Sequence, residues 1–235
     1  MVLVPGATTD HTTWQAVVPL LTLHRSVLAM DRRGYGESGD ANDYALEREF
    51  EDVAAVVDSV GEPVDVLGHC LGGLCGLEAT QLTSHIRRLV LYEPATGADA
   101  SSLDQLVPVE ALLAAGDREA ALLAFYRDMV QLAPAEIEQM RSLPTWPRRV
   151  AAAPAIIREM RGLIGYVFDA DRFEAVRAPT LLLGGSDSPE WARTSLELIR
   201  QALPHSKSVT MSGQGHVAHR TAPDVFCQEV LSFLS

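Results

Sequence analysis

The stretch Val64-Asp65-Val66-Leu67-Gly68-His69-Cys70-Leu71-Gly72-Gly73 decides the fold of this chain. Its first half is apolar and β-branched, which predicts a buried strand. A Gly-x-Cys-x-Gly pentapeptide follows, and a helix-prone segment, 71–82, comes next. The pattern is typical of a nucleophile elbow, a strained strand-to-helix turn that tolerates only small residues two positions to either side of the nucleophile. Gly68 and Gly72 meet that demand, so we expect Cys70 at a helix N-terminus, where peptide dipoles favour a thiolate.

Composition is that of a globular enzyme and excludes several partners. Of 235 residues, 47% are hydrophobic and 21% are charged, and the formal net charge is −12, which argues against nucleic acid and anionic membranes and leaves a small-molecule partner. Oligomeric state stays open. No apolar run reaches the roughly 20 residues that span a bilayer. The three cysteines, without a C-x-x-C pair, and the lack of a signal-like segment predict a cytoplasmic protein with free thiols and no metal site.

Short β-like runs alternate with amphipathic helical patterns along the whole chain. Helices are expected at 44–60, at 189–203 and near the C-terminus. This alternation predicts a single α/β domain, 1–235, with a mostly parallel sheet covered on both faces. The strand candidates are 2–4, 26–30, 64–67, 88–92, 180–183 and 208–211.

One region interrupts the alternation. Between about residues 97 and 171 no strand pattern occurs, and five prolines divide a segment rich in Ala, Leu, Arg and Glu. We expect several short helices that form a lid over the catalytic edge of the sheet. The alternative is a set of packing helices without a gating role.

Candidate catalytic partners for Cys70 follow later strands. Asp187 lies in a Gly-rich turn after strand 180–183, and His216 ends a Gly-Gln-Gly-His sequence after strand 208–211. The order nucleophile, acid, histidine is the order of an α/β-hydrolase triad. Glu93, which follows the strand ending at Tyr92, is the rival acid. At the front of the chain, strand 2–4 enters Pro5-Gly6-Ala7-Thr8, where a backbone N–H can face the elbow.

The chain resembles the α/β-hydrolase superfamily over nearly all its length. Besides the elbow, residues 31–39 (DRRGYGESG) resemble the D-x-R-G-x-G-x-S loop of lid-bearing esterases and C–C bond hydrolases. The segment 145–171 with the later Gly-Gln-Gly-His resembles small actinobacterial α/β hydrolases, and the pentapeptide is locally similar to dienelactone hydrolase. The resemblance implies an α/β-hydrolase fold with about six strands, because residue 1 already lies in the family's third strand. Cys70 replaces the usual serine, and Pro5 stands where the family often has histidine.

The resemblance also implies a mechanism without cofactor or metal. Cys70 would attack an acyl carbonyl, His216 would accept its proton, and Asp187 would orient the imidazole. The backbone N–H groups of Leu71 and Ala7 would form the oxyanion hole. A Cys-His-Asp triad of this kind predicts hydrolysis of an ester, lactone or thioester through an acyl-enzyme.

Three alternatives remain open from the sequence. The same triad could serve an acyltransferase or a cyclase if a bound nucleophile outcompetes water. Cys70 could be an engineered or drifted replacement for serine, which would leave a weakened hydrolase. The protein could also be a pseudo-hydrolase that binds a small ligand without turnover.

Several other residues have two interpretations. His11 and His219 are possible substrate contacts, although a solvated loop position is favoured for His219. Gly34 to Gly39 match G-x-G-x-x-G, a weak dinucleotide signal because no helix follows directly. Cys75 and Cys227 are expected in the core. Four lid arginines could form a solvated face or could attract an anionic or carrier-bound substrate; they are Arg148, Arg149, Arg158 and Arg161.

Overall fold

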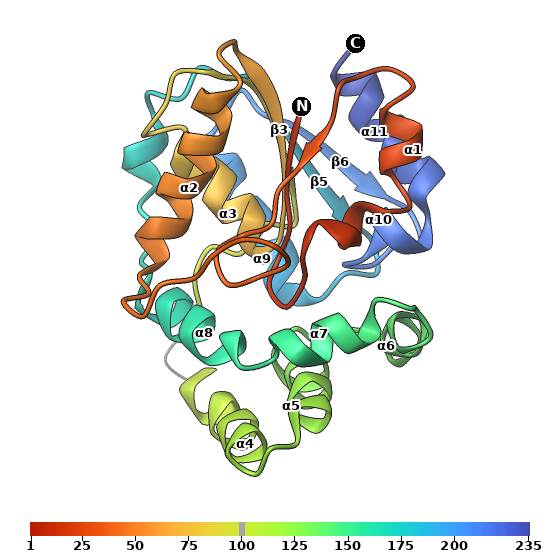
Figure 1. Ribbon diagram of the computed structural model, residues 1–235. Helices are drawn as coiled ribbons and strands as arrows, with labels where there is room; N and C mark the ends of the chain where they lie inside the picture. The colour runs from red at the N-terminus through yellow and green to blue at the C-terminus, as the bar shows by residue number, and fades with distance from the viewer. Residues whose placement is uncertain (99–101) are drawn as a thin grey trace.

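A six-stranded parallel sheet forms the centre of the molecule (Figure 1). The computed structural model describes residues 1–98 and 102–235. Within them the strand order is β2-β1-β3-β4-β5-β6, and each neighbouring pair is parallel. The α/β-hydrolase fold and the sheet of about six strands are therefore confirmed. The strands are β1 (Val2–Val4), β2 (Leu28–Ala29), β3 (Val64–His69), β4 (Ile86–Tyr92), β5 (Thr180–Gly185) and β6 (Lys207–Met211).

Helices cover both faces of the sheet because successive strand residues point to opposite sides. Val66 of β3 belongs to one core, whereas its neighbour Leu67 belongs to the other. The Val66 core packs under α2 (Leu46–Ser59), α3 (Leu71–Ala79) and α9 (Glu190–Ala202). The Leu67 core packs under η1 (His11–Trp14), α1 (Val18–Leu21) and α11 (Pro223–Phe233).

The sheet order creates a crevice at the end of β1 and β3. From β1 the chain moves outward to β2, and it then returns to the other side of β1 as β3. The loops after β1 and β3 therefore leave toward opposite faces, and ligands of open α/β sheets bind at such a switch point. Cys70 follows β3 directly, so the topology places the predicted nucleophile at this crevice.

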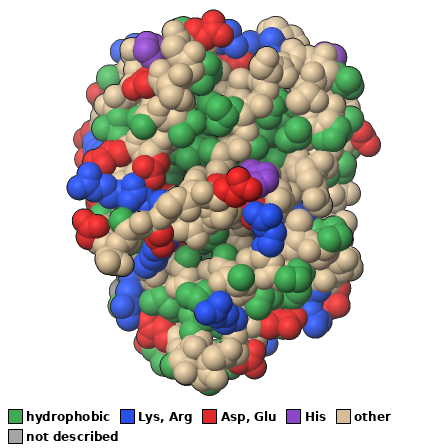
Figure 2. Space-filling view, viewed as in Figure 1, with side chains coloured by type: hydrophobic (Ala, Val, Ile, Leu, Met, Phe, Trp, Pro, Cys, Tyr) green, Lys and Arg blue, Asp and Glu red, His purple; other side chains and the backbone are tan. Residues whose placement is uncertain are grey.

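The surface carries both charge signs despite the net charge of −12. Figure 2 shows acidic and basic side chains interspersed over one face rather than gathered in a single block. Among the described residues, no helix combines the length and hydropathy required to cross a membrane.

A helical insertion separates β4 from β5. Between Ser102 and Phe173 the insertion contains only helical segments and their connections: α4 (Ser102–Ala114), α5 (Arg118–Ala124), the π-helical turn η2 (Phe125–Met129), α6 (Pro134–Arg141), α7 (Trp146–Ala152), α8 (Ala155–Gly165) and η3 (Ala170–Phe173). In Figure 1, α4 to α8 form a layer along one end of the sheet.

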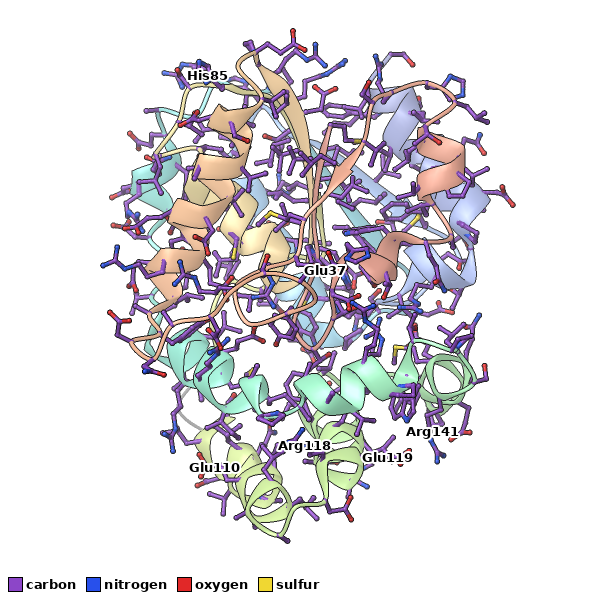
Figure 3. All side chains as sticks on the ribbon, viewed as in Figure 1. Glu37, His85, Glu110, Arg118, Glu119 and Arg141 are labelled. Atoms are coloured by element: carbon purple, nitrogen blue, oxygen red, sulfur yellow. The ribbon has the colours of Figure 1, made fainter. Side chains whose placement is uncertain are left out.

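Polar contacts join the helices of this insertion to one another. Glu119 on α5 lies 3.5 Å from Arg141 on α6, and its carboxylate accepts a hydrogen bond of 3.0 Å from the indole of Trp146 on α7 (Figure 3). The carboxylate of Glu119 thus links three helices at the surface of the insertion.

Candidate active site

The turn between β3 and α3 has the strained backbone of a nucleophile elbow. Cys70 has φ 52° and ψ −123°, which few non-glycine residues adopt. A Cβ on Gly68 would lie 2.7 Å from the Cα of Gly73, and a Cβ on Gly72 would collide with the backbone oxygen of Pro5. The two glycines are therefore required by backbone contact, as the sequence pattern predicted.

The carboxylate that contacts His216 belongs to Glu93. Oε2 of Glu93 lies 2.6 Å from Nδ1 of His216, and both side chains are buried. The other oxygen, Oε1, accepts hydrogen bonds from the amide of Gly185, at 2.7 Å, and from the hydroxyl of Ser188. Glu93 follows β4 with φ 44°, a second strained position next to the elbow. Because each oxygen has a fixed donor, the carboxylate can orient the imidazole from Nδ1.

This geometry corrects the predicted position of the acid. Asp187 is exposed at the end of β5, and its carboxylate accepts a hydrogen bond of 2.7 Å from the hydroxyl of Ser186 rather than from His216. Its backbone N–H donates to the carbonyl oxygen of Gln214 at 2.9 Å, so Asp187 supports the His216 loop through its main chain. Chain order did not distinguish the two acids, because both follow a strand and both lie between the nucleophile and the histidine.

His216 is held in its charged form by its neighbours. Burial disfavours the imidazolium, but hydrogen bonding to Cys70 and to Glu93 outweighs it and raises the pKa of His216 to about 10. The Trp191 ring packs edge-on against the imidazole, with ring centroids 5.0 Å apart. At neutral pH the sulfur of Cys70 therefore lies beside a protonated imidazole.

The ring of His69 lies between two other histidine rings, with centroids 4.5 Å from His216 and 4.6 Å from His219. Nε2 of His69 donates to the backbone oxygen of His216 at 2.9 Å, and its ring stacks on Tyr92 at 4.9 Å. The hydroxyl of Tyr92 donates in turn to the backbone oxygen of Gly215 at 2.5 Å. Burial first, and then the charge of His216, lower the pKa of His69 well below its usual range. His69 is thus a neutral positioning residue within the elbow.

A small pocket connects these groups. It has a volume of about 50 Å³, and Cys70, His216 and His219 all line it. His219 is 1% exposed, so its interpretation as a solvated loop residue is wrong. His11 does not line this pocket, because its ring pairs with Asp31 at 2.8 Å.

The predicted oxyanion donors flank the nucleophile. Ala7 lines the pocket, and Leu71 is the first residue of α3, directly after Cys70. A Cβ on Gly6 would approach the Cβ of Cys70 to 3.0 Å, which shows how closely the loop after β1 passes the elbow.

Arg32 holds the loop after β1 in place through hydrogen bonds to the backbone of that loop. Its buried guanidinium donates to the backbone oxygens of Pro5 and Gly6, both at 3.0 Å. It also pairs with Glu49 of α2 at 2.9 Å and with Glu159 of α8 at 2.8 Å. One side chain from the D-R-R-G motif therefore connects the candidate oxyanion loop to the core and to the insertion.

The Gly-rich loop at 34–39 packs closely against protein side chains. Gly36 has φ 56°, and a Cβ there would collide with the carboxylate of Asp31. A Cβ on Gly34 would meet the guanidinium of Arg158. The glycines are needed for these close contacts, which removes the basis for a dinucleotide site.

Three potential metal ligands gather near the same loop. Atoms of Asp10, His11 and Asp31 lie within 4.8 Å of one another. Asp31 already accepts hydrogen bonds from the backbone and ring of His11, and Asp10 pairs with Arg148 at 2.7 Å. The protein's own donors satisfy both carboxylates, so the cluster does not call for a cation.

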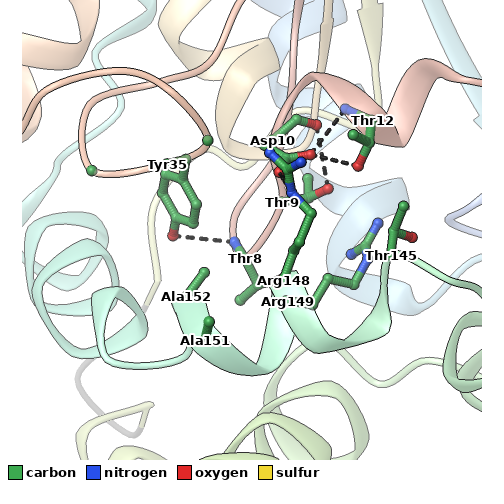
Figure 4. A pocket seen from close by; sticks show the side chains of 12 residues that line it. Thr8, Thr9, Asp10, Thr12, Tyr35, Thr145, Arg148, Arg149, Ala151 and Ala152 are labelled. Atoms are coloured by element: carbon green, nitrogen blue, oxygen red, sulfur yellow. Dashed lines mark hydrogen bonds and ion pairs between the residues drawn. The ribbon is translucent and has the colours of Figure 1, made fainter.

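An outer pocket of about 340 Å³ adjoins the nucleophile pocket. Thr8, Thr9 and Arg149 line both pockets. Figure 4 shows this outer pocket, where the hydroxyl of Tyr35 accepts a hydrogen bond of 3.2 Å from the amide of Thr8. The wall between the two pockets therefore consists of the loop after β1 and one arginine of α7.

Residues 1–229 match the Alpha/beta hydrolase family. The chain belongs to this family. A solved α/β hydrolase from Sphaerobacter thermophilus is 32% identical, with a TM-score of 0.84 over 100% of this chain and 91% of that one. A 2-hydroxy-6-oxo-6-(2'-aminophenyl)hexa-2,4-dienoic acid hydrolase from Metapseudomonas resinovorans is 25% identical over 234 residues, which cover 94% of this chain and 78% of that protein.

An esterase is also among the relatives of this hydrolase. A pimeloyl-(acyl-carrier protein) methyl ester esterase from Aeromonas hydrophila is 26% identical over 247 residues, which cover 100% of this chain and 94% of that protein. The chain is thus an enzyme of the α/β-hydrolase type, and its relatives are named for different substrates.

Proposed function

We propose that this hydrolase cleaves an ester, lactone or thioester through a Cys70–His216–Glu93 triad. The observation that carries the proposal is the buried carboxylate of Glu93, 2.6 Å from Nδ1 of a histidine that shares a pocket with an elbow cysteine. A nucleophile, a base and an acid that orients the base are the components of acyl transfer.

The reaction proceeds in two steps that both use His216. The Cys70 thiolate attacks the acyl carbonyl, and the oxyanion is stabilised by the amides of Leu71 and Ala7, at a few kcal/mol per donor. The carbon–oxygen or carbon–sulfur bond to the leaving group then breaks as the leaving group takes the proton of His216. Neutral His216 next removes a proton from water, the hydroxide adds to the thioester, and collapse releases the acid and the thiolate.

The chemistry of sulfur favours activated acyl groups. A thiolate is a better leaving group than an alkoxide, so an intermediate formed from a plain alkyl ester returns to substrate more readily than it expels the alcohol. Enol lactones, aryl esters and thioesters have leaving groups that compete with Cys70. They are therefore the preferred test substrates.

The helical insertion acts in this proposal as a lid. Phe125, Leu132 and Met140 from the insertion form an apolar wall of the nucleophile pocket. Apolar walls keep bulk water from the thioester and strengthen the electrostatic contacts inside the pocket.

Thiol reactivity and turnover together test the proposal. Brief iodoacetamide treatment near neutral pH, followed by peptide mass analysis, should label half-buried Cys70 before Cys75 and Cys227, because burial raises the pKa of both core thiols. Hydrolysis of a 4-nitrophenyl ester should be lost in Cys70→Ala and in His216→Ala.

Three outcomes contradict the proposal or a part of it. Equal labelling of all three cysteines contradicts an activated Cys70, and ligand binding without turnover in any variant indicates a pseudo-hydrolase. A Cys70→Ser variant much faster than the parent would mean that the cysteine replaced a serine nucleophile.

A further inference from the structure

Two arginines line the nucleophile pocket without an acidic partner among residues 1–98 and 102–235. Arg149 comes from α7 of the insertion, and Arg220 comes from α10 (Ala218–Thr221), just after the histidine loop. Neither guanidinium forms an ion pair within the described part of the chain, although both line the same pocket as Cys70. Buried charges are normally paired, so the arrangement needs an explanation.

Arg149 contacts only neutral oxygens. It is 7% exposed, and its guanidinium donates to the hydroxyl of Tyr126 at 3.0 Å and to the hydroxyl of Thr13 at 3.4 Å. Its Nε is buried and has no hydrogen-bond partner among the described residues. A buried guanidinium with an unsatisfied N–H group is costly unless an anion binds there.

Arg220 is half-buried and, in the part of the chain that the structure describes, also lacks an acidic partner. It donates to the hydroxyl of Thr13 at 3.3 Å, and its Nη2 lacks a partner among the described residues. Burial, followed by repulsion from Arg149, lowers the pKa of Arg220 to about 9. Thr13 thus holds two guanidinium groups close together, although their charges repel each other.

The three other lid arginines singled out from the sequence differ, because each has an acidic partner. Arg148, next to Arg149 in sequence, pairs with Asp10 at 2.7 Å. The remaining pairs are Arg158 with Asp40 at 2.7 Å and Arg161 with Glu110 at 2.6 Å. Other arginines without an ion pair, such as exposed Arg118, donate to backbone oxygens. Arg149 instead lines the pocket of Cys70 with a buried Nε that has no partner among the described residues, so the missing partner is expected in the pocket itself.

We propose that Arg149 and Arg220 form a carboxylate subsite, and that the acyl substrate is itself an acid. This inference rests on the proposed hydrolase function and names the substrate class for that site. A carboxylate presents two oxygens to two neighbouring guanidinium groups, each of which has an N–H group without a partner among the described residues. Because the pocket has a volume of only about 50 Å³, the carboxylate lies a few carbons from the reacting carbonyl. Half-esters and half-thioesters of short dicarboxylic acids fit this description.

The subsite also joins the two parts of the fold. Arg149 belongs to the insertion and Arg220 to the hydrolase core, so a carboxylate bound by both bridges α7 and α10. Arg149 also lines the outer pocket (Figure 4), which gives the carboxylate a first contact on the way to Cys70. A substrate without a carboxylate has no group that can join α7 to α10 in this way.

Matched substrates and variants test the inference. The two substrates are 4-nitrophenyl hydrogen glutarate and its methyl-capped form, methyl 4-nitrophenyl glutarate. The wild-type protein should prefer the acid in kcat/KM. Arg149→Met and Arg220→Met should each lower kcat/KM for the acid by about 10- to 100-fold, the usual effect of a lost charge-assisted hydrogen bond, and change it by less than about 3-fold for the capped ester.

Arg161→Met is the matched control, because it removes the same charge from an exposed residue of α8. It should leave both substrates unaffected. Arg149→Met removes an unpaired buried charge and should not lower Tm, which thermal unfolding checks. If Arg149→Met fails to fold, Arg149→Lys is the second variant. A loss of activity toward both substrates in Arg149→Lys would indicate a merely structural role and overturn the subsite.

Calorimetric titration with glutarate separates this inference from the proposed function. Binding that disappears in Arg149→Met and Arg220→Met supports the subsite, even if neither ester is turned over, in which case the hydrolase proposal falls alone. Turnover of both esters at equal rates, with glutarate binding unchanged in both variants, overturns the subsite and leaves the hydrolase.

Discussion

Replacing Glu93 with glutamine tests which carboxylate orients His216. The change keeps the shape of a buried side chain but removes its charge next to Nδ1. The imidazolium charge is shared by two ring nitrogens, so the charge centres lie about 4 Å apart, and at an effective dielectric of about 20 their attraction is worth about 4 kcal/mol. Since about 1.4 kcal/mol corresponds to a factor of ten, Glu93→Gln weakens the Cys70 thiolate–His216 imidazolium pair relative to its neutral form by about 10³-fold, which sets the largest loss expected in kcat.

Asp187→Asn is the matched control for this measurement. It removes the same charge from an exposed carboxylate whose partner is Ser186, so kcat should change by less than about 3-fold. Both variants are compared by single-turnover hydrolysis of a 4-nitrophenyl ester, which isolates the acylation step, and by circular dichroism. A large loss in Asp187→Asn together with a small loss in Glu93→Gln would refute the assignment of Glu93 and restore the acid predicted from the sequence.

Three further predictions concern stability and the candidate oxyanion loop. Arg32→Met should lower the free energy of unfolding, measured in urea, by about 3–5 kcal/mol, because Glu49 and Glu159 are then buried without a cation. A loss below about 1 kcal/mol would contradict this expectation. The pKa of His216 is raised from 6.5 to about 10, so the unfolded chain loses this proton first. The stability contributed by this proton is complete below pH 6.5 and is lost as pH rises toward 10. Between these pH values the unfolding free energy should therefore fall more steeply in the wild type than in His216→Gln. The same pH dependence in both proteins would disprove the raised pKa of His216. Gly6→Ala should lower kcat/KM by about 10-fold or more at nearly unchanged Tm, because its Cβ would approach Cys70 to 3.0 Å and displace the loop; unchanged kinetics would argue against an oxyanion role.

Much of the fold was predictable because it depends on local pattern. The alternation of strands and helices placed β1 at Val2–Val4 and α2 within two residues of its observed ends, since the apolar stripe of α2 is a local feature. Val60, the last residue assigned to that stripe, caps the helix and is 39% exposed, because it lies beyond the turn that faces the sheet. Cys75 and Cys227 are buried as expected.

The contacts of the arginines were not predictable from composition. Arg148 and Arg149 are adjacent and chemically identical, yet one pairs with Asp10 and the other lies unpaired beside Cys70. Successive helical residues point about 100° apart, and the packing of α7 decides which one turns inward. The ion-pair partners of Arg32 were equally unpredictable from the sequence, because Glu49 on α2 and Glu159 on α8 are distant from it in the chain.

By itself the sequence determined the elbow, because its glycines meet a steric demand within five consecutive residues, and it determined the order of nucleophile, acid and histidine. It left two carboxylates that both satisfied that order. Only the tertiary structure decided between them: β4 pairs directly with β3, so the side chain after β4 reaches the histidine beside Cys70, whereas Asp187 after β5 is exposed to solvent. A choice between residues far apart in the chain depends on which strands are neighbours, and strand neighbours are set by the packing of the whole sheet.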